Sequence, residues 1–269
     1  MTELDASRYS TVKGLIPLIK CDNLWAYSIV ENPRLGRVFV DDINAPETAL
    51  FWHFCGDAFI AGPCENGDVI RTLGEFFRGT FEHNRKRFAL YVNGEQCKKA
   101  VADIAKTVPS VQVYERYMFR FNEKTFRALD IAAPAGYALR EIDREIYDRL
   151  RGGILPKFFW DSPEAFLKAG KGYCMLGGED IACHSFGAAV GNGTVDVGIE
   201  TAPEHRGKGL AVPTAYAMVK YCADNGLTPN WGCGTTNAGS ARIAQILGFE
   251  AIGAHPVYIT EERDADNQR

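Results

Sequence analysis

A strand pattern that runs into a glycine-rich basic loop and then into a helix pattern restricts this fold more than any other feature. Alternation from Val195 to Thr201 predicts the strand, and an apolar stripe at helical spacing predicts a helix over 210–225. Between them lies the run Arg206-Gly207-Lys208-Gly209. The first N–H groups of a helix have no partner within the helix and carry the positive end of its dipole. Because glycine lets the backbone come close to a ligand, this loop predicts a site for an anion such as a pyrophosphate.

Two common phosphate-binding motifs do not fit this loop. A Walker loop requires Ser or Thr after its Gly-Lys pair, and here Gly209 follows Lys208. A dinucleotide-binding fingerprint requires a third glycine, and Val212 stands at that position. The loop therefore belongs to another class of anion site.

The chain after residue 130 shows a clear order of elements. Ser162-Pro163 is typical of a helix start, and Gly191-Asn192-Gly193 is typical of a hairpin turn. The predicted order is strand 137–142, helix 143–150, a helix from 162, strands 172–177, 180–190 and 194–201, helix 210–225, strand 228–233, helix 237–247 and strand 249–259. Residues before 121 also mix strand and helix patterns, without a recognisable site, and the sequence of the chain shows no internal repeat. The sequence therefore predicts the α/β (α+β) class.

Two motifs in the second half resemble those of one enzyme superfamily. Arg206, Gly209 and Ala211 fit the acyl-CoA loop of the GNAT (N-acetyltransferase) superfamily, Arg/Gln-x-x-Gly-x-Gly/Ala. The segment Asn237–Phe249 is similar to the Asn-helix-Gly-Phe element of that superfamily and lies at its usual distance from the loop. The order of elements over 137–259 also matches the GNAT core. The resemblance implies a mixed central sheet with flanking helices.

A narrower resemblance concerns the first half of the chain. Gly198-Ile199-Glu200-Thr201, the basic loop and Trp231 on the next strand are similar to the zwittermicin A resistance-type GNAT acetyltransferases. In that subgroup an extra α/β domain precedes the core. We therefore expect a smaller N-terminal α/β domain over 1–129, forming a wall of the acceptor cleft, and an acetyl-CoA-binding catalytic domain over 130–269.

The resemblance also implies which residues hold acetyl-CoA as the co-substrate. The backbone at Ile199 and Thr201 should pair with the pantetheine arm, and Asn237 and Ser240 should bond that arm from the other side. The alternative for Asn237 is a purely structural role as the N-cap of its helix. The pyrophosphate should lie against the amides of Arg206, Gly207, Lys208, Gly209, Leu210 and Ala211.

The reaction requires a proton acceptor, because a primary amine with a pKa of about 10.4 is almost fully protonated at neutral pH. Asp196 and Glu200 are the catalytic candidates, since their even spacing puts both on one face of the strand. Either could instead be a structural carboxylate, and the sequence does not rank them. In many GNAT enzymes a tyrosine on the last helix protonates the leaving thiolate, and this chain has Ala244 at that position. Cys233 and Tyr258 are possible substitutes, with core packing as the favoured alternative.

The remaining features exclude several other classes of protein. Thirty Lys and Arg against 34 Asp and Glu residues give a net charge of −4, which argues against a general nucleic-acid binder. There is no apolar run of about 20 residues, and Met1–Ser10 does not resemble a secretion signal, so we expect a soluble cytoplasmic protein without a membrane partner. The eight cysteines are scattered and are expected to be free buried thiols. We expect no metal, because His53 with Cys55 and His184 with Cys183 are better explained as packing pairs.

These observations lead to one main functional hypothesis. The chain is expected to be an acetyl-CoA-dependent N-acetyltransferase that acts on the primary amine of a small molecule. Two alternatives remain open: a non-catalytic acyl-CoA-binding or regulatory module, and an acyltransferase with another acyl donor or a protein acceptor. The identity of the amine and the oligomeric state do not follow from the sequence.

Overall fold

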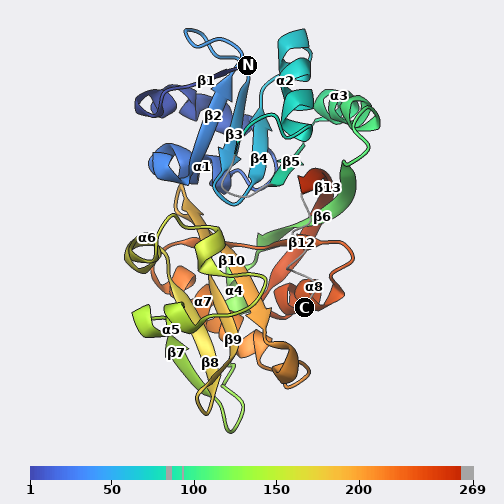
Figure 1. Ribbon diagram of the computed structural model, residues 1–269. Helices are drawn as coiled ribbons and strands as arrows, with labels where there is room; N and C mark the ends of the chain where they lie inside the picture. Colours follow the sequence, from blue (N-terminus) through green and yellow to red (C-terminus); the bar gives the residue numbers. More distant parts are fainter. Residues whose placement is uncertain (83–86, 93, 262–269) are drawn as a thin grey trace. The chain divides into compact units, whose positions relative to one another are not determined.

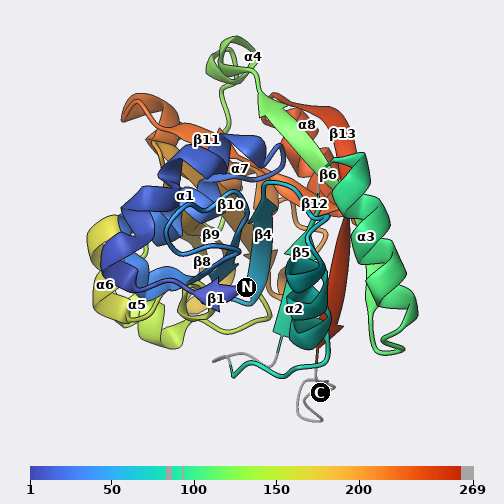
Figure 2. The ribbon, with the colours of Figure 1, turned by 90° about the horizontal axis from the view of Figure 1, so that it is seen from above.

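The computed structural model describes residues 1–82, 87–92 and 94–261, and the chain divides into two compact units. The first unit comprises Met1–Arg116 and the segment from Ala254 onward, and the second comprises Tyr117–Gly253 (Figures 1 and 2). Both units combine a mixed sheet with helices, so the predicted α/β class with a mixed central sheet is confirmed. No helix in this described part is long and apolar enough to cross a membrane.

The sheet of the first unit has the strand order β1-β2-β3-β4-β5-β13. Its strands are β1 (Thr2–Glu3), β2 (Gly36–Val40), β3 (Ala49–His53), β4 (Asp57–Ala61), β5 (Arg87–Tyr91) and the end of β13 (Phe249–Glu261). The helices of this unit are the 3-10 helices η1 (Ala6–Leu18) and η2 (Pro33–Leu35), and α1 (Leu24–Glu31), α2 (Gly67–Phe77) and α3 (Glu95–Lys106). The β4–β5 pair is parallel and the other pairs are antiparallel. Leu50, Trp52, Phe76 and Phe88 belong to the buried core that α2 and α3 share with the sheet.

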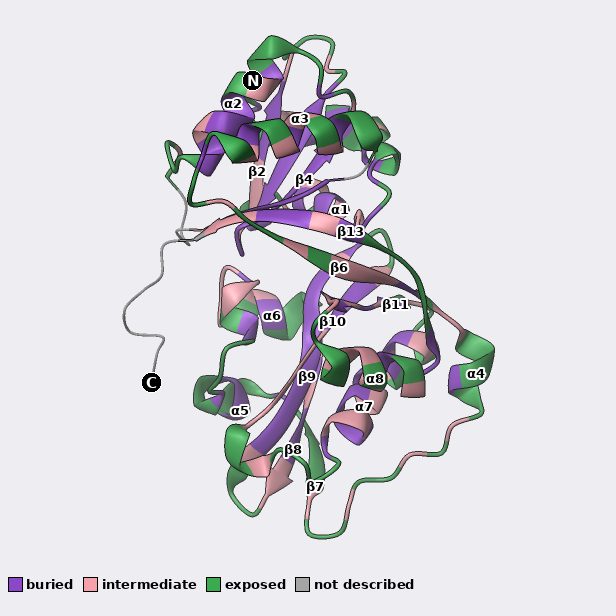
Figure 3. Cartoon of the chain, turned by 90° about the vertical axis from the view of Figure 1, so that its right-hand side faces the viewer, coloured by how far each residue is buried: buried purple, intermediate pink, exposed green. Residues whose placement is uncertain are grey.

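The sheet of the second unit has the order β11-β10-β9-β8-β7. Its strands are β7 (Ala138–Glu141), β8 (Gly172–Gly177), β9 (Asp180–Gly191), β10 (Thr194–Thr201) and β11 (Thr228–Asn230). The helices are α4 (Glu123–Arg127), α5 (Arg144–Arg149), η3 (Pro156–Phe158), α6 (Pro163–Ala169), η4 (Pro203–His205), α7 (Ala211–Asp224) and α8 (Ala238–Ile246). Strand β7 is exposed along its whole length, whereas β9 is almost wholly buried (Figure 3). The core of this unit includes Val195, Val197, Met218 and Val219, which join β10 to α7.

The predicted elements of the second unit agree closely with the observed ones. Strands 172–177 and 194–201 have the expected bounds, and β9 extends one residue beyond the expected 180–190. The expected strand 228–233 is interrupted at Trp231 and forms β11 and a short β12 (Gly232–Gly234). The indole of Trp231 is buried and its Nε1 donates to Ser240 Oγ at 3.1 Å, which turns this residue toward α8.

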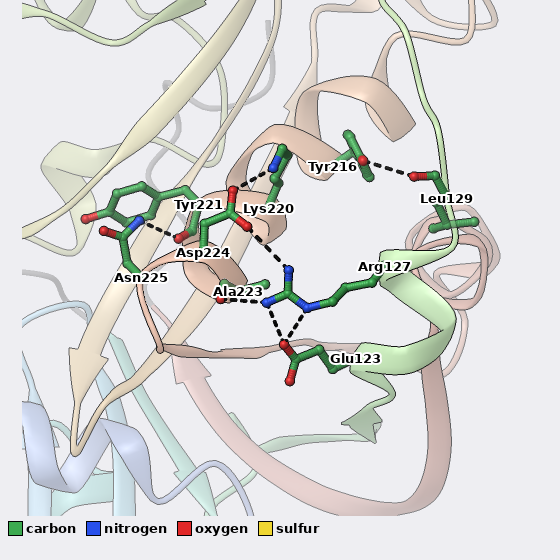
Figure 4. A network of polar contacts seen from close by, with 9 residues as sticks. All are labelled: Glu123, Arg127, Leu129, Tyr216, Lys220, Tyr221, Ala223, Asp224 and Asn225. Carbon is green, nitrogen blue, oxygen red and sulfur yellow. Dashed lines mark hydrogen bonds and ion pairs between the residues drawn. The ribbon is translucent and has the colours of Figure 1, made fainter.

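The division into units falls earlier in the chain than the expected boundary after residue 129. The boundary lies between Arg116 and Tyr117, within strand β6 (Gln112–Phe121). The segment after β6 is hydrogen-bonded to α7 (Figure 4). Arg127 donates to Glu123 Oε1 at 2.7 Å and to the carbonyl of Ala223 at 3.0 Å, and Tyr216 Oη donates to the carbonyl of Leu129 at 3.1 Å. Residues 123–129 therefore belong to the second unit.

The two units repeat one order of elements. In each, an antiparallel three-strand meander is followed by a helix, a strand parallel to the third meander strand, and a second helix. The parallel pair is β4–β5 in the first unit and β10–β11 in the second. The sequence shows no repeat of residues, and what recurs here is the order and pairing of the elements.

The expectation that all eight cysteines are free thiols was wrong. Cys64 and Cys97 form a disulfide within the first unit. Cys64 lies in the loop before α2 and Cys97 in the first turn of α3, and the fold brings these two helix starts together although 33 residues separate them. The other six cysteines are free and buried, as expected.

Candidate functional site

Strand β10 continues beyond its parallel neighbour. The pairing of β10 with β11 ends where Asp196 lies opposite Asn230, whereas β10 runs on to Thr201 and remains paired with β9 throughout. From Val197 onward, the main-chain groups on the β11 side of β10 are thus not used by β11. An extended ligand can pair with such a strand edge through its own amide groups.

The loop at the end of β10 leads to an uncapped helix start. Gly207 and Gly209 have φ values of 77° and 75°, in the left-handed region that favours glycine, and each has open space on its side-chain side. Helix α7 begins at Ala211, and no side chain caps its first turn. Helix α6, by contrast, is capped by Ser162. The first amides of α7 and the positive end of its dipole can therefore receive an anion.

The loop is anchored beneath by a buried side chain and by polar contacts. Leu210 is buried beside Met175, so it can offer a ligand only its main chain. Arg206 Nε donates to the carbonyl of Thr201 at 3.3 Å, and a ligand that used this carbonyl would have to displace Arg206. Both Arg206 and Lys208 are exposed, so they are free to supply positive charge. Tyr137 Oη lies 3.2 Å from His205 Nδ1 and fixes the loop from the other side.

Asn237 and Ser240 have structural partners of their own. Asn237 Oδ1 accepts the N–H of Ser240 at 3.0 Å, which is a normal N-cap of α8. Ser240 Oγ accepts the indole N–H of Trp231. Asn237 thus has the structural role of an N-cap. A contact of Asn237 or Ser240 with a ligand stays a prediction.

Asp196 and Glu200 occupy one face of β10 but have different surroundings. Val195 and Val197 pack toward α7, so alternation puts Asp196 and Glu200 on the opposite face. Asp196 is 7% exposed and accepts the Nδ2–H of Asn230 at 2.7 Å. Residues four apart on a strand are separated by about 13 Å, so the two carboxylates cannot contact the same amine nitrogen together.

Glu200 contacts a loop and a histidine that the sequence did not assign to the site. Its carboxylate accepts the N–H groups of Gly153 and Ile154, and His184 Nε2 lies 4.0 Å away. His184 is 3% exposed and bonds the carbonyl of Ile154 at 2.7 Å, which requires the proton on Nε2. The signal in the sequence was the pair of His184 and Glu200 on adjacent strands, but their register depends on an irregularity between β9 and β10.

The residues considered as acids in place of the missing tyrosine are core residues. Cys233 is buried in the core of the second unit, which also includes Ala244, the residue that stands in place of the tyrosine. Tyr258 belongs to the core of the first unit. Within residues 1–82, 87–92 and 94–261, no cluster of three or more His, Cys, Asp or Glu side chains is arranged to hold a metal ion.

His184 makes folding stability depend on pH. Burial lowers the pKa of His184 below its ordinary value of 6.5, so below about pH 6.5 the unfolded chain binds more protons than the folded chain at this site. This contribution to stability is complete above pH 6.5 and is lost as the pH falls, by at most about 1.4 kcal/mol per pH unit. Urea unfolding between pH 7.5 and 5.5 should therefore show a smaller pH slope in His184→Gln than in wild type. Equal slopes in wild type and His184→Gln would remove His184 from this account.

Comparison with known proteins identifies the family. A family model described as GNAT acetyltransferase matches residues 18–258. The chain belongs to the GNAT acetyltransferase family. The match spans both units, so the first unit is part of the GNAT family's own architecture. The acyl-CoA loop motif and the Asn237–Phe249 motif both lie in the second unit.

Relatives of the GNAT chain agree in length with it. An uncharacterised N-acetyltransferase of Bacillus subtilis, YdfB, is 27% identical over 96% of this chain and 98% of its own. The crystal structure of a GCN5-related N-acetyltransferase-like protein from Streptococcus suis has a TM-score of 0.71 at 21% identity, covering 94% of this chain and 98% of that one. A tandem GNAT protein from the clavulanic acid biosynthesis pathway has a TM-score of 0.59 at 14% identity, covering 98% and 99%. The GNAT family uses acetyl-CoA as co-substrate, and the chain is an N-acetyltransferase. The narrower resemblance to zwittermicin A resistance-type proteins stays a prediction.

Proposed function

We propose that this GNAT protein transfers the acetyl group of acetyl-CoA to the primary amine of a small molecule by direct attack on the thioester. The observation that carries the proposal is that β10 runs beyond its pairing with β11 and then leads, through the glycine-containing loop, to the uncapped start of α7. An extended amide-containing arm fits the first part of this path, and a pyrophosphate fits the second.

The donor is proposed to bind through main-chain groups. Ile199 and Thr201 would pair with the pantetheine arm, and Asn237 and Ser240 would contact it from α8. The amides from Arg206 to Ala211 would hold the pyrophosphate, with Arg206 and Lys208 compensating its charge. In this arrangement Leu210 contacts the donor only through its main-chain amide, and its side chain stays buried.

The acceptor nitrogen must lose a proton before or during its attack on the acetyl carbon. The nitrogen lone pair forms the new C–N bond, the C–S bond breaks, and the thiolate of CoA leaves. The candidates for the proton acceptor are Asp196 and Glu200, and one of them would take the proton either directly or through water. Since Ala244 has no acidic proton and Cys233 and Tyr258 lie in hydrophobic cores, we propose that the thiolate takes its proton from solvent.

Calorimetry with acetyl-CoA followed by an acceptor panel tests this function. We expect one binding event per chain, and release of CoA thiol when simple alkyl, polycationic and aromatic amines are supplied. Absence of binding at millimolar acetyl-CoA would overturn the proposal. Binding with neither transfer nor slow thioester hydrolysis would favour the non-catalytic acyl-CoA-binding module. The absence of a tyrosine at position 244 supports this alternative. Transfer only to peptide amines would replace the small molecule by a protein acceptor.

A further inference from the structure

The loop between α5 and η3 is held by side chains of two adjacent strands. The Gly153 N–H donates to Glu200 Oε1 at 3.0 Å, and the Ile154 N–H donates to Glu200 Oε2 at 2.7 Å. His184 Nε2 donates to the Ile154 carbonyl at 2.7 Å. His184 on β9 lies directly opposite Glu200 on β10, so the two side chains reach the loop from paired positions.

The loop approaches Glu200 so closely that only glycine fits at one position. Gly152 has a φ of 137°, and a Cβ atom there would lie 2.4 Å from Glu200 Oε2. Such a distance is far below van der Waals contact, so any side chain at 152 must push the carboxylate and the loop apart. A Cβ at Gly153 would lie 3.7 Å from Oε1, which is an ordinary contact.

These contacts leave Glu200 poorly suited to accept a proton from the substrate. Each carboxylate oxygen already accepts a main-chain N–H, and the side chain is only 18% exposed. A general base must bring a free lone pair to within about 2.6–3.2 Å of the proton donor in the bound complex. Each oxygen of Glu200 keeps one lone pair, but both oxygens are directed at the amides of Gly153 and Ile154. Asp196, about 13 Å away along the strand, has no share in this loop contact.

The same contacts present one exposed apolar side chain. Both main-chain groups of Ile154 are bonded to mostly buried side chains, whereas the residue itself is 41% exposed. An isoleucine fixed in this way beside β10 gives a rigid aliphatic surface next to the strand proposed to bind the acyl donor. Such a surface favours an amine that carries an apolar group.

We propose that Glu200 and His184 are positioning residues that hold the 152–154 loop so that Ile154 contacts the acceptor, and that Glu200 does not accept the proton. The acceptor part rests on the proposed function, whereas the loop contacts do not. Among the carboxylates put forward as proton acceptors, this leaves Asp196.

Two variants disturb the loop in different ways and share one control. Glu200→Gln replaces one accepting oxygen by an N–H donor, and Gly152→Ala pushes the loop away while leaving the carboxylate in place. Gly153→Ala adds the same methyl group at the neighbouring position without a clash. Hydrogen exchange of the peptide containing Gly153 and Ile154 reports the loop directly, whether or not a substrate is known.

The expected result is a common phenotype for the two loop variants. Glu200→Gln and Gly152→Ala should each increase exchange at Gly153 and Ile154 at least about tenfold, as expected when main-chain hydrogen bonds are lost. Both should raise the KM of the best amine in the acceptor panel, with an unchanged pH profile of kcat and unchanged acetyl-CoA affinity. Gly153→Ala should behave as wild type. Ile154→Ala should raise the KM of an apolar amine by roughly fourfold for each carbon no longer buried, without a change in exchange.

The opposite pattern would overturn the proposal. If Glu200→Gln abolishes the pH dependence of kcat while exchange stays protected and Gly152→Ala remains fully active, Glu200 is the base. Unchanged exchange in both variants would show that these contacts do not hold the loop. If exchange rises as expected but no amine is acetylated, the loop contacts stand, the acceptor role of Ile154 fails and the proposed function fails with it.

Discussion

Gly209→Val is expected to weaken acetyl-CoA binding about 100-fold and to leave the fold intact. Gly209 lies in the left-handed region with a φ of 75°, where a β-branched residue is strained. The position is exposed and open, so the new side chain meets no protein atom but stands where the pyrophosphate must approach the amides. Loss of two or three anion contacts of about 1 kcal/mol each corresponds to this fold-change. Calorimetry would measure the affinity, and circular dichroism would verify the fold.

Gly193→Val is the matched control for this variant. Gly193 has a φ of 71°, is equally open, and lies in the β9–β10 hairpin turn at the other end of β10. It carries the same backbone strain, so it should lower the melting temperature by a similar amount and leave the affinity unchanged. Equal affinities of the two variants for acetyl-CoA would refute the assignment of the loop at 206–211.

Asp196→Asn is expected to lower kcat/KM by roughly 10²–10⁴-fold, the usual contribution of a general base. Asparagine keeps an oxygen that can still accept the Nδ2–H of Asn230, so the contact between β10 and β11 survives while the proton-accepting group is lost. The acid limb of the pH–rate profile should vanish, and the affinity for acetyl-CoA should change little. Steady-state kinetics over pH 5.5–9 with the best amine of the panel would measure both effects.

Asn230→Ala provides the comparison for Asp196. It removes the hydrogen bond that Asp196→Asn keeps and leaves the carboxylate in place, so a purely structural role of the bond predicts a large loss in Asn230→Ala and little loss in Asp196→Asn. A much smaller loss in Asn230→Ala, with the acid limb retained, is the result we expect. Unchanged kinetics in Asp196→Asn would eliminate Asp196 as the base.

The second unit could be predicted from the sequence because its signals are local. The turn at Gly191-Asn192-Gly193 and the capping Ser162 each fix one element, and β8 and β10 have the predicted bounds. The loop before α7 and the start of that helix were predicted for the same reason, since two glycines and a helix start lie within a few residues. The predictions fail where partners are distant in sequence, as for Cys64 and Cys97.

Two features of the first unit escaped prediction for physical reasons. Helix α1 is apolar on nearly every face and only eight residues long, so its pattern does not distinguish it from a buried strand. Helix η1 is a 3-10 helix that contains Gly14 and Pro17, two residues that disfavour a helix interior. In both cases burial in the unit, rather than local preference, determines the structure.

The contact between His184 and Glu200 could not be predicted because it depends on register. Asp196 lies opposite Ala189, but Val197 lies opposite Gly187, so one residue of β9 is passed over. Without this bulge the hairpin would put Ser185 opposite Glu200, and His184 would face the other side of the sheet. A bulge of one residue leaves no signal in the alternation of β10.

The course of β13 has a consequence for the synthesis of the protein. Strand β5 of the first unit pairs with residues 257–261, so Tyr91 meets Val257 across 166 residues of chain (257 − 91). A nascent chain that has passed residue 116 therefore still has an incomplete first sheet, with the apolar strand β5 open at one edge. At about 5–20 residues per second, translation needs on the order of ten seconds to supply the missing strand. During that time β5 is a target for chaperones and for pairing with other nascent chains, and the half of the molecule made first is the half that closes last.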